Sequence, residues 1–105
     1  VLSPDWNTYK IEWGKKIHIR DLYEKNASYQ EKFISANPNF LLSSVISASL
    51  ADGYLYFLEE KKKGCYYLEL ALKLDKWGYD EREAENLKEG AKYYLEELKR
   101  LGVCK

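Results

Sequence analysis

The chain has 105 residues, and its 17 basic and 17 acidic side chains leave it with no net charge at pH 7. Hydrophobic residues make up 46% of the sequence and aromatic residues 15%, which excludes an intrinsically disordered protein. This length predicts one domain over residues 1–105, large enough to bury a core without a metal or a disulfide. The balanced charge argues against nucleic acid or a membrane surface as the partner.

The first helix is predicted to begin at Ser3, because serine is a favourable N-cap and Pro4 fits the first turn. Its apolar face consists of four residues at helical spacing: Trp6, Tyr9, Trp13 and Ile17. This helix either breaks after Ile17 or continues to about Lys25.

A capping-box pattern at Ser28 and Glu31 predicts the start of a second, short helix, which stops before Pro38. Pro38 then opens a central buried helix that extends to about Lys62. The small residues along this helix, mostly serine and alanine, permit the close approach of a neighbouring helix. The dipeptide Asp52-Gly53 could kink it, although a continuous helix is favoured.

Gly64 is predicted to end the central helix, and the next helix covers residues 65–77. Asp80 and Glu83 form a cap pair for the last helix, over residues 81–101. Apolar side chains recur along this last helix at spacings of three and four, as one seam: Ala84, Leu87, Ala91, Tyr94, Leu98 and Leu101. The last two predicted helices form a hairpin.

Strand signals are weak, since apolar and polar residues alternate only over residues 16–20. The sequence therefore predicts an all-α fold: a single-domain bundle of about four to five helices with a C-terminal helical hairpin. The bundle is expected to centre on residues 40–58, with a helix content well above the typical third of residues.

The chain lacks the residues that most catalytic, metal and cofactor sites need. Its one histidine, His18, and its two cysteines are too few and too widely spaced for a zinc site. No glycine-rich phosphate loop is present. Residues Val1-Leu2-Ser3-Pro4 and Trp13-Gly14-Lys15 resemble the opening of a vertebrate α-globin, but no histidine follows His18 to bind haem. We therefore expect no catalytic residue, no metal and no cofactor, haem included.

The two cysteines lie far apart in the predicted hairpin. Cys65 would lie opposite about residue 92, so a helical path would carry Cys104 roughly 18 Å beyond it. A disulfide needs Cα atoms within about 7 Å of each other. The sequence therefore favours two free thiols, which is the usual state in a reducing cytosol, and leaves a disulfide as the alternative.

The final helix is predicted to be longer than its hairpin partner, so that apolar side chains on the overhang need cover. Leaving leucines in water would forfeit roughly 1.5–3 kcal/mol each. The cover is either the N-terminal helix or the same helix of a second subunit across a two-fold axis, and the ten tyrosines favour the second subunit. The predicted interface residues are Trp6, Trp13, Tyr94, Leu98 and Leu101.

These features predict a non-catalytic protein–protein interaction or assembly module that forms a homo-oligomer. The alternative is a small nucleic-acid-binding or regulatory protein that uses two basic clusters, Lys61, Lys62 and Lys63 in one and Lys15, Lys16 and Arg20 in the other. Lysines in a last helical turn also complement the helix dipole, so the triplet has a structural explanation. Strong nucleic-acid affinity is therefore not expected. An enzyme that works through carboxylates alone has no supporting motif.

No signal peptide or membrane span is predicted, which favours a cytoplasmic protein. Lysine (14) and glutamate (12) are abundant, while methionine is absent and glutamine, threonine and histidine occur once each. This composition is typical of proteins from hyperthermophiles.

Overall fold

A computed structural model describes residues 19–105 of the chain, and this range contains helices and connections but no strand. The four helices are α2 (Ile19–Ala36), α3 (Ser43–Tyr56), α4 (Lys61–Leu74) and α5 (Glu81–Arg100). The predicted all-helical class is therefore confirmed. The predicted helix from Ser3 lies outside the described residues, apart from its possible continuation into α2.

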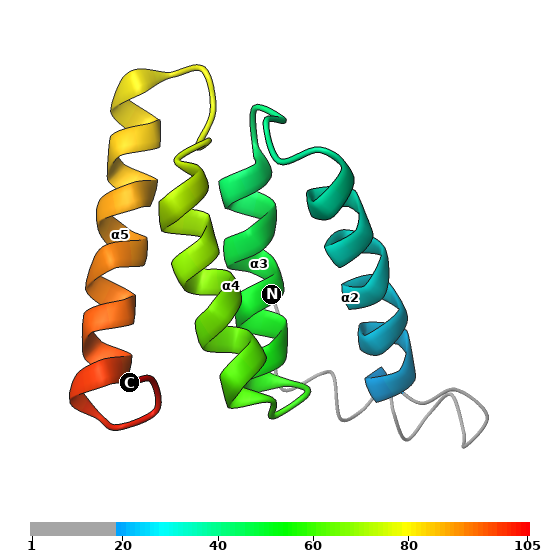
Figure 1. Ribbon diagram of the computed structural model, residues 1–105. Coiled ribbons are helices and arrows are strands. Elements are labelled where there is room, and N and C mark those ends of the chain that lie inside the picture. The colour runs from blue at the N-terminus through cyan, green and yellow to red at the C-terminus, as the bar shows by residue number, and fades with distance from the viewer. Residues whose placement is uncertain (1–18) are drawn as a thin grey trace.

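Helices α3 and α4 form the centre of the bundle, with α2 on one side and α5 on the other (Figure 1). Consecutive helices run in opposite directions, which follows from their short connections. No helix of the described chain is long and apolar enough to cross a membrane.

Buried serines allow α3 and α4 to pack closely. The Ser44 hydroxyl donates to the carbonyl oxygen of Ala71 at 2.6 Å, and the Ser47 hydroxyl donates to that of Tyr67, also at 2.6 Å. Both serines are fully buried, so these bonds satisfy hydroxyl groups that would otherwise be costly to bury. The predicted use of small residues for close helix approach is seen at this contact.

The predicted helix boundaries are wrong at several places. Ser28 lies in the middle of α2 and starts no helix, because the residues before it are already helical. The central helix ends at Tyr56 instead of Lys62, although it continues through Asp52-Gly53 as favoured. Between α3 and α4, Glu59 has a positive φ of 54°, which interrupts the helical conformation of the backbone.

The prediction that Gly64 ends a helix is wrong, because Gly64 lies buried inside α4. A Cβ at this position would lie 2.4 Å from Cγ of Leu55 and 3.3 Å from the carbonyl oxygen of Ala51, so a side chain there would force Leu55 of α3 to shift. Helix α4 ends at Leu74, three residues before the predicted last residue, Trp77, because Asp75 adopts the left-handed conformation.

The start of α5 is as predicted. The Asp80 carboxylate accepts hydrogen bonds from the backbone N–H groups of Arg82 and Glu83, at 2.9 and 3.2 Å. Only part of the predicted seam is buried, however. Ala91 and Leu98 lie in the core together with Leu95, whereas Leu101 is 63% exposed.

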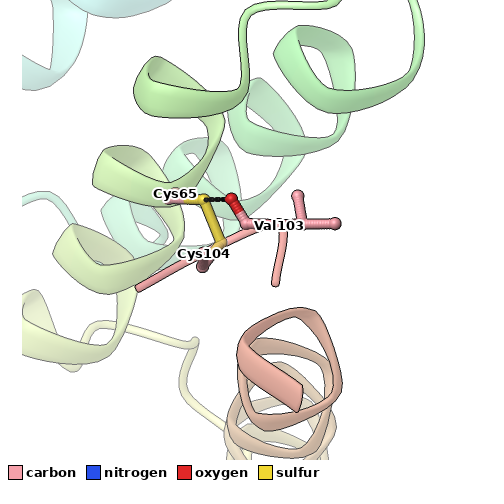
Figure 2. Close-up of a disulfide and its surroundings, with 3 residues drawn as sticks. All are labelled: Cys65, Val103 and Cys104. Atoms are coloured by element: carbon pink, nitrogen blue, oxygen red, sulfur yellow. Dashed lines mark hydrogen bonds between the residues drawn. A yellow bond between two sulfur atoms is a disulfide. The ribbon is translucent and has the colours of Figure 1, made fainter. Parts of the chain in front are cut away.

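The expectation of free cysteines is overturned, because Cys65 and Cys104 form a disulfide with Cα atoms 5.7 Å apart (Figure 2). The chain reverses after α5, where Gly102 has a φ of 80°. The N–H groups of Val103 and Cys104 then donate to the carbonyl oxygen of Leu98. This reversal carries Cys104 back beside α4, whereas the prediction assumed a helical path that moved away from it.

Candidate functional site

A cleft of about 330 Å³ lies between α2 and α3. From α2 it is lined by Tyr23, Asn26, Ala27 and Gln30, and from α3 and the residues just after it by Ser49, Leu50, Asp52, Gly53, Tyr56, Phe57 and Leu58. We call it the α2–α3 cleft. Its size is at the small end of the range for ligand sites in proteins.

Of the residues that the structure describes, Asp52 is the only charged one that lines the α2–α3 cleft. Its side chain reaches solvent, yet the surrounding protein removes enough water to raise the pKa of its carboxyl above the ordinary value. Within the described chain it forms no ion pair. A carboxylate left without a partner in a cleft is a feature of functional sites.

Aromatic rings form much of the cleft wall. Tyr23 and Phe57 stack with their ring centroids 4.6 Å apart and an interplanar angle of 11°. The ring of Tyr56, which also lines the cleft, stacks on Tyr94 of α5 with centroids 6.4 Å apart. The cleft therefore combines one carboxylate with several aromatic faces.

Tyr94 extends this polar region toward α5. Its hydroxyl is buried and makes no hydrogen bond among the described residues. Burial raises the pKa of this hydroxyl, and the neighbouring Tyr56 and Asp52 raise it further.

Exposed apolar side chains share a helix side with Asn26, which lines the cleft, and with Tyr94, which stacks on the cleft residue Tyr56. On α2, the side of the helix that carries Asn26 also carries three apolar residues, at helical spacings of four before it and three and seven after it. They are Leu22, Tyr29 and Phe33. On α5, residues seven before and seven after Tyr94 share its side, namely Leu87 and Leu101. All five are exposed. We call the surface formed by Leu22, Tyr29, Phe33, Tyr56, Leu87 and Leu101 around the cleft the outer face.

A second polar cluster joins α2, α3 and α4, away from the outer face. The Tyr54 hydroxyl donates to the Glu31 carboxylate, and Lys63 Nζ lies 3.9 Å from the same carboxylate. Lys63 Nζ also lies 5.1 Å from the centroid of the Tyr54 ring. Burial first and Glu31 second raise the pKa of both Tyr54 and Tyr67. Because its members satisfy one another, this cluster joins helices and offers no free group to a ligand.

The lysine triplet lies in the first turn of α4, and not in the last turn of a helix as predicted. The helix dipole disfavours cations at this end, so the predicted structural explanation for the triplet is wrong. Lys63 is engaged by Glu31, whereas Lys61 and Lys62 are exposed. In the other basic cluster, Lys15 and Lys16 lie outside the described residues, and Arg20 belongs to the first turn of α2.

The predicted interface residues separate into three groups. Trp6 and Trp13 lie outside the described residues. Leu98 is 8% exposed and packs in the core beside Cys104, so it is already covered by its own chain. Tyr94 and Leu101 lie on the side of α5 that belongs to the outer face.

The overhang argument therefore holds only in part. Helix α4 begins four residues earlier than predicted, at Lys61, and the chain after α5 folds back. Both changes shorten the unsupported length of α5. Leu87 and Leu101 nevertheless stay exposed without cover from the described chain.

Sequence reasoning missed Asp52, because the Asp52-Gly53 dipeptide was interpreted only as a turn signal. The available signal was a single acidic residue within an otherwise uncharged helix. Asn26 and Gln30 give no such signal, since polar residues on an exposed helix side are ordinary. No group of three or more metal-ligating side chains occurs in the described part of the chain.

Comparisons with known protein families, with curated proteins and with solved structures find no match to this chain.

Proposed function

We propose that this protein is a non-catalytic interaction and assembly module that associates with a second copy of itself through the outer face. The proposal depends on the exposed apolar residues of two helices. Those of α2 share the helix side of Asn26, which lines the cleft, and those of α5 share the side of Tyr94, which stacks on Tyr56 of the cleft. Apolar side chains gathered on one face are typical of protein interfaces, whereas singly scattered ones are ordinary. Two residues of the outer face, Tyr29 and Tyr56, are tyrosines, and tyrosine is enriched at such interfaces.

The C-terminal helical hairpin is part of this proposal. Helices α4 and α5 are joined by residues 75–80, and the disulfide between Cys65 and Cys104 ties their far ends together. A hairpin closed at both ends would hold Leu87 and Leu101 in a fixed position relative to α3. Such preorganisation lowers the entropy lost on association.

The disulfide and the composition bear on the cellular compartment of the protein. A cytoplasmic location was predicted, and disulfides are rare in a reducing cytosol except in hyperthermophiles. The disulfide and the lysine- and glutamate-rich composition together agree with the cytoplasm of a hyperthermophile. The same disulfide agrees equally with an oxidising compartment.

Nucleic-acid binding through Lys61, Lys62 and Lys63 is the second candidate. It is favoured by the position of the triplet, since cations in the first turn of α4 do not serve the helix dipole. It is disfavoured by Glu59 and Glu60 immediately before and by the pairing of Lys63 with Glu31. Binding to DNA or RNA that weakens steeply with added salt would favour this candidate.

Replacing Leu87 with Asp tests the proposed self-association. We expect the wild-type mass in light scattering to rise with concentration and the Leu87→Asp protein to stay monomeric, because a buried carboxylate at the interface would be desolvated. Tyr93→Asp is the matched control, since Tyr93 is exposed on another side of α5. Circular dichroism checks that both variants are folded. A wild type that is monomeric at every concentration would refute self-association.

A further inference from the structure

We propose that the α2–α3 cleft binds an organic ammonium group, held by the Asp52 carboxylate among the aromatic rings of Tyr23, Tyr56 and Phe57. The cleft lies within one chain, so this inference is tested on the monomer and does not depend on self-association. The ligand chemistry is that of a lysine side chain or of a free alkylamine.

The charge of the cleft selects a cation. Asp52 lines it, and among the described residues no lysine, arginine or histidine does so. Within the described chain no cation pairs with Asp52. Bringing an ammonium group to this carboxylate would therefore pair a partly desolvated charge instead of disrupting an existing ion pair.

The uncharged lining suits the same ligand. Aromatic faces attract ammonium groups electrostatically, and the attraction grows when water is excluded. The carboxamides of Asn26 and Gln30 and the hydroxyl of Ser49 also line the cleft. Their oxygen atoms can accept the hydrogen bonds that an ammonium group must make once it leaves water.

The protein already contains one completed site of this chemistry. Lys63 Nζ lies 3.9 Å from the Glu31 carboxylate and 5.1 Å from the centroid of the Tyr54 ring. The α2–α3 cleft has the carboxylate and the rings but no ammonium group from the described chain. The missing component is the one that a ligand would supply.

The test uses n-butylammonium chloride and its neutral counterpart 1-butanol, each titrated into the oxidised full-length protein at a concentration where light scattering shows a monomer. We expect amide shifts in 1H–15N spectra at the cleft residues with n-butylammonium and much weaker shifts with 1-butanol. Asp52→Asn should weaken n-butylammonium binding by about tenfold or more, because the charge-assisted bond is lost. Glu69→Gln, which removes an exposed carboxylate of α4, should leave it unchanged.

Equal binding of the two probes, or full binding by a folded Asp52→Asn protein, would overturn the proposal. Phe57→Leu supplies a second variant, in which we expect a severalfold loss specific to n-butylammonium. Adding n-butylammonium at higher protein concentration identifies the source. Dissociation of the oligomer supports a lysine from the second copy as the natural occupant, and an unchanged oligomer supports a free amine. Self-association without any n-butylammonium binding would refute this inference and leave the proposed function standing.

Discussion

Asp52 carries a charge that its own fold makes harder to keep. Desolvation raises the pKa of its carboxyl, and within the described chain no cation compensates. A carboxyl whose pKa is higher in the folded than in the unfolded state binds its proton more tightly when folded. Ionising Asp52 therefore lowers the stability of the protein. Proteins commonly accept such a cost where a group serves binding.

Asp52→Asn should accordingly stabilise the free protein at neutral pH. The gain is expected to be at most about 0.5 kcal/mol, because the side chain is exposed. The difference between the two proteins should shrink as pH falls through the raised pKa of Asp52 toward about 3.9, the value in an unfolded chain, since Asp52 then becomes neutral. Chemical denaturation of both proteins across this pH range measures it. A less stable Asn variant at neutral pH would contradict the account of Asp52.

Residues that act through local geometry were the predictable ones. Asp80 caps α5 as predicted, because a cap needs only its own backbone neighbours. The surroundings of Asp52 are formed partly by α2 and Tyr94, which lie far from it in sequence. No spacing pattern encodes that meeting, and for this reason the candidate site was not predicted.

At the scale of elements, the bundle was predictable and its boundaries were not. The apolar repeats correctly indicated helices, since periodicity reports burial directly. Ser28 and Gly64 carry strong local signals for a helix start and stop, yet both lie inside helices. Packing decides at such positions, because a Cβ at Gly64 would lie 2.4 Å from Cγ of Leu55.

Two glycine substitutions separate packing from helix propensity. Gly64→Ala should destabilise the protein by about 1–2 kcal/mol, because the clash with Leu55 outweighs the propensity gain of alanine. Gly90→Ala is the matched control in α5, where an added Cβ meets nothing within 4 Å. It should stabilise by about 0.5–1 kcal/mol. Thermal melts of both variants give the comparison, and a Gly64→Ala protein at least as stable as the wild type would show that the α3–α4 contact is looser than described.

For the whole molecule, the disulfide closes a large part of the chain. Cys65 and Cys104 are 39 residues apart, so their bond removes much of the freedom of the unfolded chain. Reduction, or the double change Cys65→Ala and Cys104→Ala, should lower the stability by about 2–4 kcal/mol. Thermal melts with and without a thiol reductant test this. Identical melting temperatures would indicate that the bond is absent or without effect.

The outer face is the central claim of this account, and hydroxyl-radical footprinting reports on it side chain by side chain. The wild-type protein would be labelled when dilute and when concentrated. We expect labelling of Leu22, Tyr29, Phe33, Tyr56, Leu87 and Leu101 to fall with concentration, because association covers them. Labelling of Tyr66, Tyr79 and Tyr93, which are exposed elsewhere, should stay constant. Unchanged labelling of the outer face in a sample that does associate would contradict the claim, and protection of the second group instead would place the interface elsewhere.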